Sequence, residues 1–240
     1  MDLSTLGVKL VKLLMKREYK FHLKVIEPNS SNLSHYVVNI IIEKNHIESE
    51  MASGIDKVFS LALVKGICEA GEIISRIDRL ANSDVIAGGF FSKTAKERCL
   101  IEAYERQAIL WHIDKNIPLI YHQSVDSSQG AITLALLATN SPYFHCVAYS
   151  NAESQNDFNY CCSVEKNINF DRVLFKLNTA NINKIRLNPK DVSEQFRLSI
   201  IKPNKCPNKE MVFDFFSFKN KTRFTRVDSP LKLFNFFEIC

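Results

Sequence analysis

Hydrophobic and polar residues alternate with two different periods along this chain. Apolar positions recur with the helical period in the middle of the sequence, which predicts long helices at 58–80 and 92–114, with Ser92 as the N-cap of the second. A short amphipathic helix is predicted at 3–17 and a third helical segment at 170–187. Period-two alternation predicts strands at 19–26, 35–43, 85–91, 119–123, 131–139, 143–150, 196–202, 212–218 and 231–239. Helices flanked by runs of strands are typical of an α+β fold.

The two long helices carry the same sequence pattern twice. Residues 62–72 read ALVKGICEAGE and residues 95–105 read AKERCLIEAYE, so that the matching positions are 33 residues apart. An alanine, an aliphatic residue and a Glu-Ala-x-Glu run occupy the same places in both copies. Each copy follows a short glycine-containing segment, Ser53-Gly54 in the first and Gly88-Gly89 in the second. The chain therefore contains an internal repeat.

Each copy of the repeat contributes a pair of glutamates, Glu69 with Glu72 and Glu102 with Glu105. Residues three apart lie on one face of a helix, with Cβ atoms roughly 5–6 Å apart, so the carboxylates of a pair repel each other unless a cation lies between them. Carboxylate oxygens are ligands that suit Mg²⁺, and Arg106 is placed to contact a phosphate. The competing hypothesis is that all four glutamates are solvated positions on amphipathic helices.

Composition and charge restrict the protein to a few classes. At 240 residues and 46% hydrophobic, the chain can bury a substantial core, and no linker divides it, so a single domain over residues 1–240 is predicted. No apolar run reaches the roughly 18–20 residues that cross a bilayer, and the lysines near the N-terminus do not suit a signal peptide. A cytoplasmic protein without membrane association is expected. The net charge of +5 is scattered, so nucleic-acid binding is not indicated.

Other catalytic signatures are missing from the sequence. There is no P-loop, no G-x-S-x-G elbow, no H-E-x-x-H motif and no dinucleotide fingerprint. The seven cysteines contain no CxxC pair, so they are predicted to be mainly buried free thiols. His112 and His145 are predicted to have structural roles. The acidic repeat is therefore the main candidate for chemistry.

The repeat resembles a known family. The segment from Ser53-Gly54 to Glu72, and the run Leu100–Ala108 with Trp111 after it, are similar to the two successive nucleotide-binding helices of the YcaO family. The resemblance covers residues 50–115 well and residues 160–187 weakly. It implies a YcaO-type α+β domain with internal helix and strand repeats around a nucleotide site. YcaO proteins use ATP and Mg²⁺ to activate backbone amides of ribosomally synthesised precursor peptides, which leads to thiazole or oxazole precursors (azolines) by cyclodehydration, or to thioamides or amidines.

The resemblance also implies roles for individual residues. The metal ligands would be the four glutamates of the repeat, Glu69, Glu72, Glu102 and Glu105, and Arg106 would contact phosphate. The substrate would be a precursor peptide, and a chain of this length implies a separate peptide-recognition or partner subunit. The chain departs from the family pattern at Ile55, Lys65, Phe90, Thr94 and Ala180, where other residue types are usual.

These departures leave three hypotheses about function. In the first, Lys65 replaces the usual lysine at position 55 as a phosphate contact, and the protein is an active ATP-dependent peptide-modifying enzyme. In the second, the nucleotide site has decayed, and the protein is a catalytically silent YcaO-like subunit that binds a peptide or an active enzyme subunit. In the third, the protein is an unrelated α+β binding module whose glutamates are surface positions.

Overall fold

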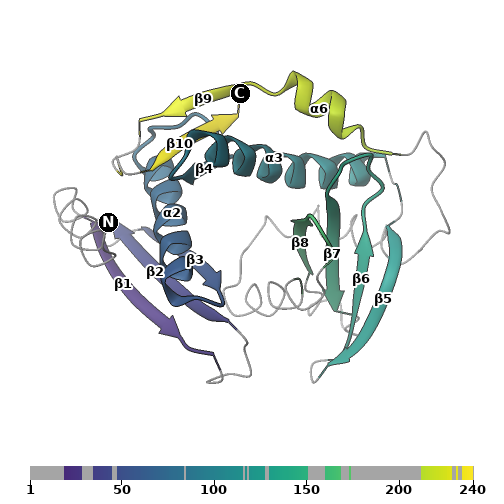
Figure 1. Ribbon diagram of the computed structural model, residues 1–240, viewed down its shortest axis with the longest axis horizontal. Helices are drawn as coiled ribbons and strands as arrows, with labels where there is room; N and C mark the ends of the chain where they lie inside the picture. The colour runs from purple at the N-terminus through teal and green to yellow at the C-terminus, as the bar shows by residue number, and fades with distance from the viewer. Residues whose placement is uncertain are drawn as a thin grey trace. The chain divides into compact units, whose positions relative to one another are not determined.

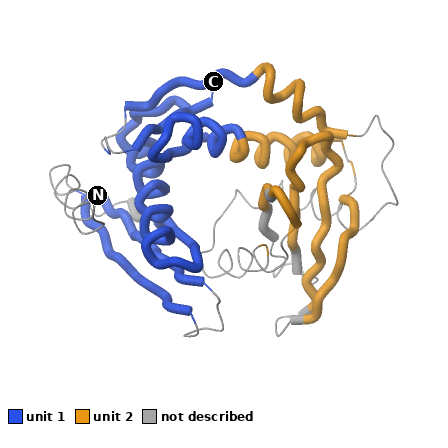
Figure 2. The backbone as a smooth tube through the Cα atoms, viewed as in Figure 1, with its two compact units in different colours: residues 1–100, 222–240 blue, residues 101–221 orange. Residues whose placement is uncertain are grey.

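The structure is a computed structural model, and it forms two compact units (Figure 2). Unit 1 contains residues 1–100 and 222–240, and unit 2 contains residues 101–221. The expectation of a single domain over the whole chain stays a prediction. The structure describes residues 19–28, 35–44, 48–83, 85–115, 117, 119–127, 130–150, 160–168, 173, 212–228, 231 and 234–239.

Unit 1 begins with an antiparallel sheet that a long helix covers (Figure 1). The strands are β1 (Tyr19–Ile26), β2 (Tyr36–Lys44) and β3 (Glu48–Asp56), in the order β1-β2-β3, and the helix is α2 (Phe59–Ile77). The apolar face of α2 packs on the buried residues of β2 and β3, because both elements place one hydrophobic face toward the same core. The predicted strands at 19–26 and 35–43 and the helix at 58–80 are confirmed.

A second sheet of unit 1 joins the middle of the chain to its C-terminal part. Its strands are β4 (Ile86–Gly89), β9 (Phe224–Val227) and β10 (Asn235–Ile239), in the order β4-β10-β9, and both pairings are antiparallel. Phe236 of β10 is buried against two glycines, Gly71 of α2 and Gly88 of β4, where any Cβ would come within 2.5 Å of its ring. One aromatic ring therefore joins α2 to the second sheet.

Unit 2 contains a four-stranded antiparallel sheet, in the order β5-β6-β7-β8. Its strands are β5 (Ile120–Ser127), β6 (Gly130–Leu136), β7 (Phe144–Ser150) and β8 (Tyr160–Glu165). The boundary between the units falls inside helix α3 (Ser92–Asp114), after Leu100. Within unit 2, Tyr104 of α3 is fully buried and its hydroxyl donates to Thr139 Oγ1 at 2.7 Å.

The α+β class and the second long helix agree with the sequence prediction, whereas the strand predicted at 212–218 is wrong. Helix α6 (Phe215–Lys221) begins within that segment, and Asp214 caps it by accepting a hydrogen bond from Ser217 N–H at 3.0 Å. The density of apolar residues in this segment is typical of a buried strand. The side chain of Asp214 nevertheless satisfies a backbone N–H of the first helical turn, which favours a helix. Strands β3, β8 and β9 were not predicted as strands.

Several other sequence predictions lie outside the described residues. These are the helix at 3–17, the strand at 196–202, the departure at Ala180, and, except for Val173, the helical segment at 170–187. Among the helices that the structure describes, none is both long enough and apolar enough to cross a membrane.

Candidate functional site

The sequence repeat is also a structural repeat of strand, turn and helix. Strand β3 ends at Asp56 and α2 begins at Phe59, while β4 ends at Gly89 and α3 begins at Ser92, so both boundaries are shifted by 33 residues. The first helical hydrogen bonds are equivalent as well: Ala62 N–H donates to Val58 O and Ala95 N–H donates to Phe91 O, each at 3.0 Å. The repeat is therefore confirmed at the level of backbone geometry. It places Phe91, not Ser92, in the N-cap position of α3.

A basic side chain ties each helix of the repeat to the strand before it. In the first copy, Lys65 Nζ donates to Ile55 O at 3.0 Å and forms an ion pair with Asp56 at 2.7 Å. The hydrogen bond from Lys65 lowers the pKa of Asp56 below its ordinary value. In the second copy, Arg98 Nη1 donates to Gly88 O. Because Lys65 matches Arg98 and Ile55 matches Gly88 in the repeat, the two contacts are equivalent.

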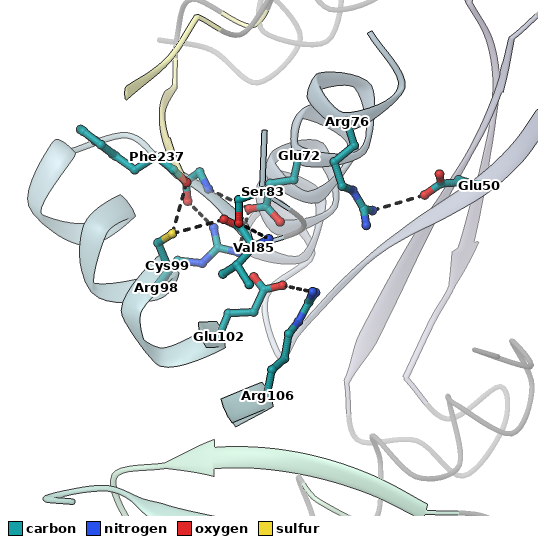
Figure 3. Close-up of polar contacts among 11 residues, drawn as sticks. Glu50, Glu72, Arg76, Ser83, Val85, Arg98, Cys99, Glu102, Arg106 and Phe237 are labelled. Carbon is teal, nitrogen blue, oxygen red and sulfur yellow. Dashed lines mark hydrogen bonds and ion pairs between the residues drawn. The ribbon is translucent and has the colours of Figure 1, made fainter. Parts of the chain in front are cut away.

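The acidic pair of α2 has one half-buried and one buried carboxylate. Glu69 is half-buried, and its Oε2 accepts a hydrogen bond from Ser53 N–H at 3.1 Å. Glu72 is 8% exposed, and its Oε1 accepts from Gly88 N–H at 2.8 Å and lies 3.3 Å from Arg98 Nη2 (Figure 3). A buried carboxylate needs such partners, because burial without a counter-charge costs several kcal/mol. Glu72 is thus fixed by the chain itself.

The thiol of Cys68, which interacts with both Arg98 and Glu72, is unreactive. Cys68 is one helical turn before Glu72, and burial raises the pKa of its thiol to about 12, although the neighbouring Arg98 opposes part of that shift. A thiol with this pKa stays protonated at neutral pH and is a poor nucleophile. Cys68, Cys99 and Cys146 are buried free thiols, as predicted. The side chains of the other four cysteines lie outside the described part of the structure.

The acidic pair of α3 belongs to unit 2 and is more accessible than Glu72. Glu102 Oε1 lies 2.7 Å from Arg106 Nη2 one turn later, and the side chains are 34% and 45% exposed (Figure 3). Pairs of this kind contribute roughly 0.3–0.5 kcal/mol, so a ligand can displace them at low cost. Glu105 is half-buried, and its backbone carbonyl accepts a hydrogen bond from His145 Nε2 at 2.9 Å.

The structure does not test the assignment of a metal to all four glutamates. Glu69 and Glu72 belong to unit 1, and Glu102 and Glu105 belong to unit 2. Within the part of the chain that the structure describes, no group of three or more His, Cys, Asp or Glu side chains is arranged to hold a metal ion. The four-glutamate metal site stays a prediction, and so do the phosphate contacts of Lys65 and Arg106.

The histidines near the repeat have structural roles, as predicted. His112 is 1% exposed; its Nδ1 donates to Ala108 O at 2.8 Å, and its Nε2 accepts from Ala138 N–H at 3.0 Å. Burial lowers the pKa of His112 to about 4, so the ring is neutral at physiological pH. His145 is also 1% exposed and packs edge-on against the Tyr104 ring. Neither ring is positioned as an accessible general base.

The departures from the family pattern have identifiable surroundings where the structure describes them. Ile55 is half-buried in β3, and Thr94 is exposed on the first turn of α3. Phe90 stacks on Phe234 with ring centroids 4.7 Å apart, and its carbonyl accepts from Asn235 Nδ2 at 2.8 Å. Phe90 therefore attaches the turn before α3 to the C-terminal strand.

Sequence reasoning missed Arg98. The signal was present, because the 33-residue offset that pairs the glutamates also pairs Lys65 with Arg98. The family resemblance points to Lys65 and Arg106 as basic site residues and gives no role to position 98. The structure shows that Arg98 is the cationic partner of Glu72.

Comparison with known proteins relates this fold to solved structures. No protein-family model matches the sequence, and no curated protein matches it. The structure of YcaO from Methanopyrus kandleri bound with AMPPCP and Mg²⁺ is similar with a TM-score of 0.60 and 10% identity, over 99% of this chain and 89% of that one. A chain of the E. coli microcin synthetase McbBCD complex is similar with a TM-score of 0.51 and 9% identity, over 90% of this chain and 86% of that one. The chain therefore has a YcaO-like α+β fold.

Proposed function

We propose that this protein is an ATP- and Mg²⁺-dependent enzyme that activates backbone amides in a ribosomally synthesised precursor peptide. The observation that carries the proposal is the accessible pair of Glu102 and Arg106, which lies on the second helix of the repeat in a YcaO-like fold. The Methanopyrus kandleri protein of the same fold was solved with AMPPCP and Mg²⁺. A nucleotide and a metal at the acidic helices are therefore the chemistry that we assign to this chain.

The proposed reaction transfers a phosphoryl group from ATP to an amide oxygen. A Cys, Ser or Thr side chain of the peptide then displaces the phosphate and gives an azoline. External sulfide or amine in place of the side chain gives a thioamide or an amidine. The chain's contribution is to bind the nucleotide and orient its phosphates, because positioning and charge stabilisation account for most of the catalysis of phosphoryl transfer.

The four glutamates of the repeat differ in how well they suit Mg²⁺ as ligands. Carboxylates are suitable ligands, and Glu69, Glu102 and Glu105 are each half-buried. Bound Mg²⁺ would neutralise phosphate oxygens of the nucleotide. Arg106 would donate to a phosphate after leaving Glu102, and the exposed ion pair between them makes this exchange inexpensive. Glu72 is different, because its buried carboxylate already faces Arg98.

The first test is thermal unfolding with and without Mg-ATP. Binding at 100-fold excess over the dissociation constant stabilises a folded protein by about 2.7 kcal/mol, so a rise in Tm is expected. Glu102→Gln with Glu105→Gln should remove turnover and the Mg²⁺-dependent part of the shift and leave the fold intact. Glu97→Gln, an exposed glutamate on the same helix, is the matched control and should retain both. Full turnover in the double variant would contradict the metal assignment.

Product chemistry is tested by mass spectrometry of a co-expressed precursor peptide. Cyclodehydration removes one water from the peptide, whereas thioamide formation exchanges oxygen for sulfur. An unmodified peptide in the presence of wild-type protein, ATP and Mg²⁺ would contradict the enzymatic proposal for that peptide. The double glutamate variant serves as the negative control.

A second candidate function is a catalytically silent subunit that binds a peptide or an active enzyme. The observation that favours it is the engagement of Lys65, the proposed phosphate contact, with Asp56 and Ile55 O. The similarity to a chain of a microcin synthetase complex is consistent with a multi-subunit assembly. The absence of any Tm shift with ATP, ADP or AMP would decide for this candidate, and co-purification with a partner subunit would then be the expected result.

A further inference from the structure

The guanidinium of Arg98 faces two oxygen atoms of unit 1. Its Nη2 lies 3.3 Å from Glu72 Oε1, and its Nη1 donates to the carbonyl oxygen of Gly88 (Figure 3). Gly88 N–H in turn donates to Glu72 Oε1 at 2.8 Å. Arg98, Gly88 and Glu72 thus form a closed ring of contacts between α3, β4 and α2. Both polar backbone groups of Gly88 take part in it.

These two oxygen atoms are of the kind that a hard divalent cation binds. Carboxylate and backbone carbonyl oxygens are typical ligands of Mg²⁺ and Ca²⁺, and Mn²⁺ also prefers oxygen. The carboxylate side chain is 11% exposed, whereas the Arg98 side chain is 42% exposed, so the cation covers the carboxylate from the solvent side. Cys68 beside them is neutral because burial raises its pKa to about 12, and it supplies no competing charge.

The first copy of the repeat supports this interpretation. There, Lys65 contacts the carbonyl oxygen of Ile55 and the carboxylate of Asp56. Each copy therefore places one basic side chain between the carbonyl of a strand and a carboxylate. In the first copy the carboxylate is Asp56, the last residue of strand β3, and in the second it is Glu72 of the neighbouring helix α2.

We propose that Arg98 takes the place of a divalent cation at Glu72. Glu72 is then a positioning residue that holds the β4–α3 turn through Gly88, and it is not a metal ligand in this chain. The inference rests on the proposed function, in which acidic residues of the repeat bind Mg²⁺, and it removes one of the four glutamates from that set. The positive charge that Glu72 of α2 needs is then supplied by Arg98 and not by a metal ion.

The test is metal rescue of stability, measured without nucleotide. Arg98→Met keeps much of the aliphatic side chain and leaves Glu72 Oε1 and Gly88 O without their cation. We expect the Tm to fall by about 5 °C in EDTA, because a largely buried carboxylate loses its counter-charge. Mn²⁺ should restore most of this loss in Arg98→Met. It should restore none in Arg98→Met with Glu72→Gln, where the anionic ligand is absent.

Two further variants control for nonspecific effects. Arg76→Met removes an exposed pair with Glu50, 3.3 Å apart on the same unit, and should show neither the loss nor the rescue. Arg98→Lys retains a cation at the site and should not respond to Mn²⁺ more than the wild type. Paramagnetic resonance of bound Mn²⁺ should count about one more ion per chain in Arg98→Met than in its double variant with Glu72→Gln.

Two outcomes would overturn the inference. One is a Tm of Arg98→Met that Mn²⁺ does not change. The other is a wild-type protein that Mn²⁺ stabilises through Glu72, so that Glu72→Gln abolishes the effect. Both are distinct from failure of the proposed function, which shows as the lack of a Tm shift with Mg-ATP in the wild type.

Discussion

Replacement of Gly54 by alanine should separate β3 from α2. A Cβ at position 54 would lie 1.8 Å from the carbonyl oxygen of Ala62 and 2.3 Å from the backbone nitrogen of Gly66. Real Cβ contacts are at least 3.0 Å, so the strand must move from the helix by at least 1.2 Å, the difference between 3.0 and 1.8 Å. The colliding atoms are backbone, which cannot rotate away as a side chain can. Overpacking usually costs about 1–3 kcal/mol, and the upper end applies here.

The expected loss is therefore about 3 kcal/mol in the free energy of unfolding, which corresponds to a fall in Tm of roughly 6–12 °C for a protein of this size. The same shift should lengthen the hydrogen bond from Ser53 N–H to Glu69 Oε2, which is 3.1 Å in the structure. The strand–helix contact thus connects packing with the position of a candidate ligand. Urea unfolding followed by circular dichroism measures the loss directly.

Gly66 on the facing helix provides the matched control. A Cβ there would lie 3.3 Å from Val38 O and 3.4 Å from Gly54 N, which a shift of a few tenths of an ångström accommodates. Alanine also gains about 1 kcal/mol of helix propensity over glycine, so Gly66→Ala should remain within about 1 kcal/mol of the wild type. The packing argument is refuted if Gly54→Ala costs less than about 0.5 kcal/mol, or if both substitutions cost the same.

Two further predictions follow from buried polar groups. The pKa of His112 is about 4 in the folded protein and 6.5 ordinarily, so the unfolded chain takes up the proton first as the pH falls. Above pH 6.5, His112 should therefore have no effect on the free energy of unfolding, which should fall by about 3 kcal/mol between pH 6.5 and 4. Urea titrations at several pH values measure this fall. If His112→Gln shows the same dependence of stability on pH as the wild type, the prediction is wrong. Glu238 is 2% exposed and accepts from Asn82 N–H at 2.6 Å and Ser83 N–H at 2.9 Å. Glu238→Leu should cost about 1–3 kcal/mol and lower the Tm, whereas Glu238→Gln, which retains an acceptor oxygen, should cost less; equal costs would show that these hydrogen bonds are unimportant.

Local features of the sequence predicted much of the fold. The long helices have a clear apolar period, and the structure places the second of them at the predicted residues, Ser92–Asp114. The strand predicted at 212–218 is wrong because its phenylalanines suit either a strand or a helix, and the cap at Asp214 favours the helix. Strand β3 was missed because its small residues, Ala52 to Gly54, carry little strand propensity and are selected by close packing on α2.

The candidate site was predicted only in part for a similar reason. The spacing of Glu69 with Glu72 and of Glu102 with Glu105 is visible in the sequence, because a helix places residues three apart on one face. The partner of a carboxylate is not visible in the same way. Glu72 is satisfied by Gly88 and Arg98, which come from the next strand and the next helix. The offset between Lys65 and Arg98 is the one signal that pointed to this contact.

The sequence by itself determined the repeat, its two helices and the identity of the acidic positions, since helix period and residue spacing are local properties. Only the tertiary structure decided that the C-terminal strand β10 pairs with β4 and that Phe236 fills the space above Gly71 and Gly88. It also decided that Glu72 faces a guanidinium. Strand pairing and the burial of charge depend on which distant segments share a core. This cannot be decided segment by segment, because every polar group that becomes buried must find a partner elsewhere in the folded chain.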